Sequence, residues 1–176
     1  MEIGIRILQN LLFQFEAEKV IVNWLRTEPT LMKIDLENNS NYNCDEIGIQ
    51  SIAEFALTKL GIHSESELAI RLVTEEEMAQ LHLKWMDLPG PTDVLSFPMD
   101  ELKPNSAKNG PGVVGDIVLC PEFASKNGKQ SLEMELELLT VHGVLHLLGF
   151  DHEELSEEKV MFALQEDFLM QWRTNS

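Results

Sequence analysis

The spacing of three histidines near the C-terminus constrains the fold of this chain more than any other feature. They occupy positions 142, 146 and 152, within eleven residues. Residues four apart lie on the same face of an α-helix, so His142 and His146 can direct their imidazoles to one point. Gly149 stands where a left-handed residue can end the helix and reverse the chain. That reversal would bring His152 to the same point.

Such a cluster has the chemistry of a catalytic metal site. Three neutral imidazole nitrogens with one position left open are typical of catalytic rather than structural zinc. The alternative is a set of ordinary half-buried helix residues, but three histidines at this spacing, with glycine at the turn, favour a metal. Imidazoles also bind nickel and other divalent ions, so the donors alone do not select zinc. We therefore expect a zinc hydrolase with one Zn²⁺ per chain, held by His142, His146 and His152.

The residue after the first histidine argues against an ordinary peptidase. The spacing equals that of the metzincin motif H-E-x-x-H-x-x-G-x-x-H. In those peptidases the glutamate after the first histidine activates the zinc-bound water. This chain has Gly143 at that position, which offers no side chain for the task. A hydrolase of another substrate, including a peptidase with an unorthodox base, remains an alternative.

Hydrophobic patterns and capping residues predict four short strands and about five helices. The strands are expected at 33–37, 67–73, 92–98 and 113–120, and the helices at 46–60, 75–83, from 121 onward, 131–148 and 156–172. Because strands and helices do not alternate strictly, the pattern predicts an α+β fold with a small mixed sheet of four strands.

The chain length of 176 residues suits a single domain. A complete strand–helix–strand pattern can begin at Met32, so we expect the domain to span residues 32–172, with a short tail at 173–176. Residues 1–31 fit this domain poorly. We interpret them as an extension that is absent from the native protein or dispensable.

The net charge of the chain and its expected cellular compartment limit the partners that it can bind. The chain carries 30 acidic against 13 basic side chains, a net charge of −17, which disfavours a polyanionic partner. Residues 131–176 carry ten acids against two bases, whereas residues 68–130 carry nine against six, so a less acidic face for RNA is compatible with the total. No long apolar run, signal peptide or disulfide framework is visible, which indicates a cytoplasmic protein.

The segment 142–152 also matches the H-G-x-L-H-L-x-G-[YF]-D-H signature of the YbeY endoribonuclease family. The resemblance extends through residues 67–73, 91–98 and 115–120, and covers roughly residues 32–172. It implies a zincin-like α+β domain that holds zinc through the three histidines. It further implies a single-strand-specific endoribonuclease that acts in 16S rRNA 3′-end maturation and ribosome quality control. The implied partners are single-stranded rRNA, the ribosomal small subunit or its proteins, and a ribosome-associated GTPase, with no membrane and no DNA.

The resemblance also singles out Arg71 as the functional arginine, with His142 as the second catalytic residue. An arginine whose alternate neighbours in a strand are apolar requires a partner. One interpretation is a structural ion pair with Asp93 or Asp116. The other, which we favour, is a bidentate clamp on the scissile phosphate.

Two further expectations concern the site and its function. Asp151, next to a ligand, is a candidate acceptor that orients an imidazole, and a polar turn residue is the equal alternative. A protein of a different class would be a metal-stabilised adaptor without turnover, because an acidic surface suits basic ribosomal proteins.

Overall fold

The computed structural model describes residues 32–175. The predicted extension at residues 1–31 lies outside the described residues. Within the described part, no helix is both long and apolar enough to cross a membrane.

In residues 32–175, four strands form one mixed sheet in the order β1-β2-β4-β3. Their bounds are Lys33–Asn38 for β1, Glu67–Leu72 for β2, Val94–Pro98 for β3 and Val113–Leu119 for β4. The pairs β1–β2 and β2–β4 are parallel, whereas β3 runs antiparallel to β4. Strand β3 therefore forms one edge of the sheet.

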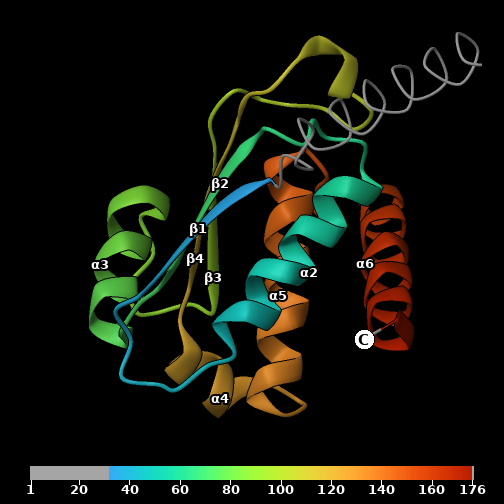
Figure 1. Cartoon of the computed structure of the whole chain (residues 1–176). Coiled ribbons are helices and arrows are strands. Elements are labelled where there is room, and N and C mark those ends of the chain that lie inside the picture. Colours follow the sequence, from blue (N-terminus) through green and yellow to red (C-terminus); the bar gives the residue numbers. More distant parts are fainter. Residues whose placement is uncertain (1–31, 176) are drawn as a thin grey trace, which may run out of the picture. The chain divides into compact units, whose positions relative to one another are not determined.

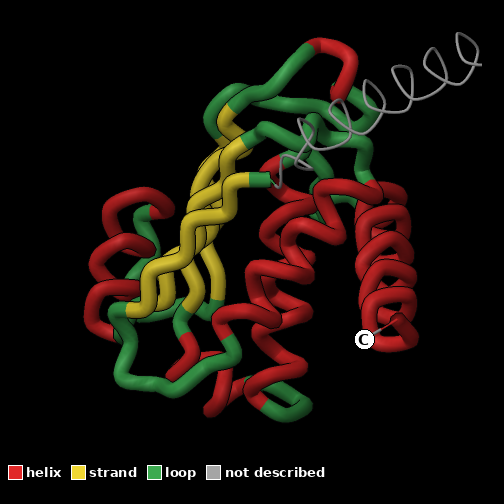
Figure 2. The backbone as a smooth tube through the Cα atoms, in the orientation of Figure 1, coloured by secondary structure: helices red, strands yellow, loops and turns green. Residues whose placement is uncertain are grey.

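Five α-helices of the described residues pack around this sheet, as the sequence predicts, and the α+β fold class is confirmed. They are α2 (Glu46–Lys59), α3 (Glu75–Met86), α4 (Pro121–Asn127), α5 (Leu132–Leu147) and α6 (Leu155–Asn175), with a short 3-10 helix η1 at Ala107–Asn109. Figure 1 shows α3 on one face of the sheet and α2, α5 and α6 on the other. The strands, yellow in Figure 2, separate these two groups of helices.

Two hydrophobic clusters correspond to these two faces. The larger one joins alternate side chains of β2, such as Leu68, Ile70 and Leu72, to α2, α5 and α6. The smaller one lies on the α3 face and contains Val73, Met78, Leu95, Val118 and Cys120. Because successive residues of a strand point to opposite faces, the position of a strand residue in this alternation tells which group of helices it meets.

Two helices run further than their apolar patterns predict. Helix α6 continues to Asn175, beyond the expected end near residue 172, because Arg173 forms an ion pair of 2.9 Å with Glu137 on α5. Helix α3 continues to Met86, where Asp87 in the left-handed region (φ 56°) closes it by donating its N–H to the carbonyl of Leu83. Polar contacts and a cap, rather than buried apolar residues, extend both helices.

Candidate metal centre

The structure brings the three histidines together. His142 and His146 lie one turn apart on α5, and their Nε2 atoms are 3.1 Å apart. Each of the three histidines, His152 included, offers one ring nitrogen to the cluster. These three nitrogens all lie within 4.8 Å of one another. The ring of His152 stands 5.3 Å from that of His142 and 5.0 Å from that of His146, measured between centroids.

The glycine turn predicted from the sequence is what places His152. Gly149 has φ +84°. Its N–H donates to the carbonyl of His146 at 3.0 Å, and the N–H of Phe150 donates to the carbonyl of Leu145 at 3.1 Å. These two bonds are the pair that defines a Schellman motif, which satisfies the last carbonyls of a helix while reversing the chain. The reversal returns the third histidine to the face of α5 that carries the first two.

Helix α6 contributes two side chains that lie next to the histidine cluster, Gln165 and Phe162. Oε1 of Gln165 lies 3.0 Å from Nδ1 of His142. The ring of Phe162 lies 5.8 Å from that of His152 and 6.5 Å from that of His142. An acceptor on Nδ1 fixes the imidazole tautomer that leaves the Nε2 lone pair free for a metal ion.

Gln165 is the site residue that the sequence interpretation missed. It is 9% exposed and lies four residues after Met161 and three before Phe168, both buried. A polar side chain on the buried stripe of an amphipathic helix is the signal that could have identified it. From the sequence, Asp151 is expected either to accept from an imidazole or to serve as a polar turn residue. The hydrogen bond found for its Oδ1 is with the backbone N–H of His152, at 2.7 Å.

Burial keeps two of the histidines in the form that binds metal. It lowers the pKa of His142, which lies mostly inside the domain. It also lowers the pKa of His146 to about 4, with a further contribution from the neighbouring imidazoles. Both rings are therefore neutral at pH 7, and a neutral imidazole is the ligand that zinc requires.

The cluster fits a tetrahedral ion. Two nitrogens that each lie about 2.0–2.1 Å from a tetrahedral zinc ion are about 3.3 Å apart. The 3.1 Å between Nε2 of His142 and Nε2 of His146 agrees with that separation. His152 follows a turn and is exposed, so its side chain can approach by the small amount that a bound ion demands.

Gly143 lies where α5 comes close to the sheet. A Cβ added to this glycine would stand 3.0 and 3.1 Å from carbons of Ile117 and 3.1 Å from Oγ of Ser96. Ile117 belongs to β4 and Ser96 to β3. Gly143 therefore allows α5 to pack closely against the sheet. The Cβ of a glutamate at position 143 would lie in this tight contact.

Arg71 lies on the other face of the sheet. Its neighbours Ile70 and Leu72 point into the cluster with α5, so the arginine side chain points to the α3 face. There its Nη1 lies 3.4 Å from Oε1 of Glu77, on α3. The ion-pair partners considered from the sequence, Asp93 and Asp116, are thus wrong. The structure does not bring Arg71 together with the three histidines, and the phosphate clamp stays a prediction.

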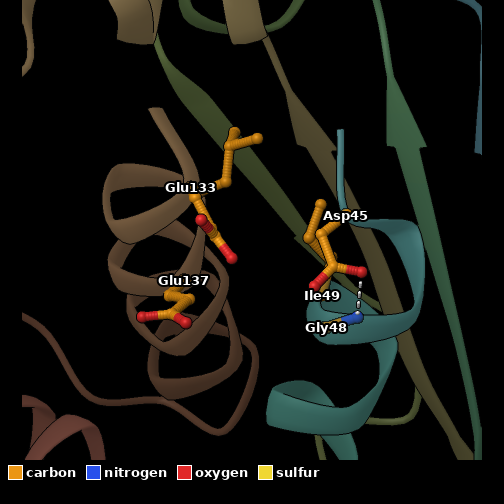
Figure 3. Close-up of a pocket in the computed structure, with 6 residues that line it drawn as sticks. Asp45, Gly48, Ile49, Glu133 and Glu137 are labelled. Carbon is orange, nitrogen blue, oxygen red and sulfur yellow. Dashed lines mark hydrogen bonds between the residues drawn. The ribbon is translucent and has the colours of Figure 1, made fainter. Parts of the chain in front are cut away.

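A separate hollow lies between the N-terminal ends of α2 and α5 (Figure 3), and none of the three histidines lines it. Its carboxylates come from Asp45, Glu133 and Glu137. Oδ1 of Asp45 accepts from the N–H of Gly48 at 3.0 Å and so caps α2, while Glu137 pairs with Arg173. Two of the three carboxylates thus have structural tasks.

The fold and the site define an α+β protein with a three-histidine centre, built on one helix and the glycine turn that follows it. Comparison with known proteins identifies the group to which it belongs. The model of the family described as Endoribonuclease YbeY matches residues 33–173. The chain belongs to this family, and so to the nucleases, enzymes that hydrolyse phosphodiester bonds.

Individual relatives agree with this assignment. The chain is 54% identical to the endoribonuclease YbeY of Streptomyces coelicolor, over 81% of this chain and 91% of the relative. It is 52% identical to the endoribonuclease YbeY of Mycolicibacterium smegmatis, over 80% and 83% of the two chains. Among solved structures, the solution structure of TM1509 from Thermotoga maritima is similar, with a TM-score of 0.52 and 26% identity, over 81% of this chain and 93% of that one.

Proposed function

We propose that this chain is a zinc-dependent endoribonuclease that cuts single-stranded RNA and acts in 16S rRNA 3′-end maturation and ribosome quality control. The observation that carries the proposal is the meeting of three histidine nitrogens within 4.8 Å, in a chain of the endoribonuclease YbeY family. The ribosomal role places its action in the cytoplasm, with single-stranded rRNA, small-subunit proteins and a ribosome-associated GTPase as partners.

The donor set supports zinc as the ion. His142, His146 and His152 would hold one Zn²⁺ and leave a fourth position open to substrate. When bound, the ion supplies Lewis acidity, which polarises a phosphate oxygen and lowers the pKa of a water molecule towards about 7. Three imidazoles also accept other divalent ions, so the proposal of zinc requires metal analysis of the purified chain.

The residues of the chain have distinct tasks in this proposal. Gln165 holds His142 in the tautomer that presents Nε2, and the ring of Phe162 lies beside the rings of His142 and His152 and supplies an apolar side to the cluster. The nucleophile is either water or the ribose 2′-hydroxyl. The products distinguish them, because attack by the 2′-hydroxyl leaves a cyclic phosphate on the upstream fragment, whereas attack by water does not.

A direct experiment tests the activity. Purified chain loaded with zinc should cut a single-stranded RNA, and chelation of the metal should stop the cleavage. His142→Ala should abolish both metal retention and cleavage. His63→Ala is the matched control, because His63 lies outside the cluster and its Nδ1 accepts from the backbone of Glu65. Cleavage that survives in His142→Ala would mean that a contaminating nuclease cuts the RNA.

A metal-stabilised adaptor without turnover is the second candidate. The observation that favours it is the net charge of −17, which suits basic ribosomal proteins better than RNA. If the zinc-loaded chain cuts no RNA but still captures small-subunit proteins, the adaptor function is correct. An rRNA precursor extended at its 3′ end in cells that lack the protein would support the nuclease instead.

A further inference from the structure

The turn between α5 and α6 borders an open hollow of about 290 Å³. It is lined by Gly149, Phe150, Asp151, Ser156, Glu157 and Val160. The hollow adjoins the metal centre, because Asp151 immediately precedes His152 and its charge acts on His146. Pockets for drug-sized ligands measure about 300–1,000 Å³, so this hollow suits a smaller group.

The lining has the chemistry that a nucleobase needs. Phe150 and Val160 offer apolar contact, whereas Asp151, Ser156 and Glu157 offer oxygen atoms. Carboxylates accept hydrogen bonds from the amino groups of bases. Single-stranded RNA exposes such edges, because its bases are free to leave the stack and enter a protein pocket.

A lysine lies beside Gly149, one of the residues that line this hollow. Nζ of Lys103 lies so close to Gly149 that a Cβ added to that glycine would be 2.8 Å from it. The backbone beside Lys103 is anchored, because Leu102 packs against the larger hydrophobic cluster and the N–H of Asn105 donates to the carbonyl of Leu60 at 2.8 Å. The lysine is thus directed to the turn by its own loop.

The Lys103 amine has no acidic partner in the described part of the chain, where no carboxylate lies within 4.0 Å of it. The exposed Lys108 of the same loop also lacks one, so it is the position of Lys103 beside Gly149 that distinguishes it. The segment that borders the hollow is strongly acidic, with Asp151, Glu153, Glu154, Glu157 and Glu158. An RNA phosphate that approaches the histidines therefore needs a local cation to offset this repulsion.

We infer that the hollow and Lys103 form a binding subsite for one nucleotide of the RNA next to the scissile phosphate. The base enters the hollow, and the phosphate of the same nucleotide binds the Lys103 amine. This inference rests on the proposed function, because it assumes an RNA substrate. A structural alternative is that Lys103 only complements the negative C-terminal end of α5.

The phosphate contact is tested by the salt dependence of RNA binding. The full chain, stripped of metal so that it binds without cutting, is titrated with a short fluorescent single-stranded RNA at several salt concentrations. For single strands, each phosphate contact contributes about 0.7 to the slope of log K against log salt. Lys103→Ala should reduce the slope by about 0.7, and Lys103→Arg should restore it. The dissociation constant for Lys103→Ala should rise about three- to fivefold, as expected for the loss of one exposed ion pair.

Lys108→Ala is the matched control, since Lys108 is an exposed lysine of the same loop, in η1. It should bind RNA as the unmodified chain does. Equal effects of Lys103→Ala and Lys108→Ala would overturn the inference, and so would a lower melting temperature of Lys103→Ala with an unchanged salt slope. If the zinc-loaded unmodified chain neither binds nor cuts single-stranded RNA, the proposed function itself fails.

The base contact is tested by filling the hollow. Val160 is 54% exposed, so Val160→Trp can place an indole in the hollow without disturbing the core. This variant should bind RNA more weakly but bind an abasic strand as well as the unmodified chain does. Met170→Trp, at an exposed position of α6 outside the hollow, is the control. Unchanged binding of ordinary RNA by Val160→Trp would overturn the placement of the base.

Discussion

Oε1 of Gln165 lies 3.0 Å from Nδ1 of His142 and joins α6 to the helix that carries two of the three candidate ligands. Both atoms belong to side chains that are largely removed from water, since Gln165 is 9% exposed and His142 is half-buried. A metal ion on Nε2 requires the hydrogen on Nδ1, and that hydrogen then donates to the amide oxygen. The contact therefore selects the ring tautomer that the site needs.

Removal of the acceptor at Gln165 should weaken the metal site. We expect Gln165→Leu to lower metal affinity by about 10- to 100-fold, because the imidazole loses the partner that orients it. Gln165→Glu keeps an acceptor oxygen and should retain most of the affinity. Competition with a chelator measures this without any assay of RNA cleavage. Gln80→Leu, at an exposed position of α3, should leave the affinity unchanged; an equal loss in both leucine variants would refute the role of Gln165.

The turn at Gly149 should be sensitive to any side chain. With φ +84°, an L-residue other than glycine is strained there by about 1–2 kcal/mol. We expect Gly149→Ala to lower the free energy of unfolding by that amount in urea titrations, and to weaken metal binding because His152 is displaced. Gly149→Asn should cost less, since asparagine adopts the left-handed region more readily. The prediction is wrong if the alanine variant is as stable as the asparagine variant.

The parts of the site that local sequence encodes were predictable. The pairing of His142 with His146 follows from helix geometry, and the return of His152 follows from the conformational freedom of Gly149. The four strands and five helices follow from hydrophobic period and from caps such as Thr74, whose Oγ1 accepts from the N–H of Glu77 at 3.3 Å.

Contacts between distant segments were not predictable in this way. Gln165 reaches His142 across 23 residues, and the partner of Arg71 depends on which face of β2 meets α3. A strand pattern gives the alternation of faces but not the helix that covers each face. The same limit explains why the apolar pattern predicts too early an end for α6, because the Glu137–Arg173 pair joins residues 36 positions apart.

The close packing at Gly143 predicts that a metzincin-like glutamate cannot be introduced there. Gly143→Glu would force its Cβ against Ile117 and Ser96 and bring a charge to the buried side of α5. Overpacking of this kind costs about 1–3 kcal/mol, and an unpaired charge adds to it. We expect a loss of at least about 2 kcal/mol in unfolding free energy and no gain of peptidase activity.

Gly143→Ala serves as the graded control for this position. Its smaller overpacking is offset by the better helix propensity of alanine, about 1 kcal/mol, so its stability should stay within about 1 kcal/mol of the unmodified chain. A stable Gly143→Glu variant that hydrolyses peptides would revive the peptidase alternative.

Variants of Arg71 and of its ion-pair partner Glu77 can show whether the arginine binds phosphate or only forms the ion pair. The Arg71–Glu77 pair spans 3.4 Å, and its side chains are 37% and 40% exposed. An ion pair so open to solvent contributes about 0–1 kcal/mol. If Arg71 binds an RNA phosphate, Arg71→Lys should reduce turnover by roughly 100-fold, because lysine lacks the planar, bidentate geometry. Metal content and unfolding free energy should not change.

Glu77→Gln separates the two roles of this arginine. The variant removes the ion pair but leaves the guanidinium available, so turnover should be kept or increased if Arg71 binds phosphate. If the pair is the only task of Arg71, then Arg71→Lys and Glu77→Gln should both retain full turnover and show similar, small changes in stability. Steady-state cleavage of single-stranded RNA and urea unfolding of the two variants decide between these outcomes, and full turnover of Arg71→Lys would exclude the clamp.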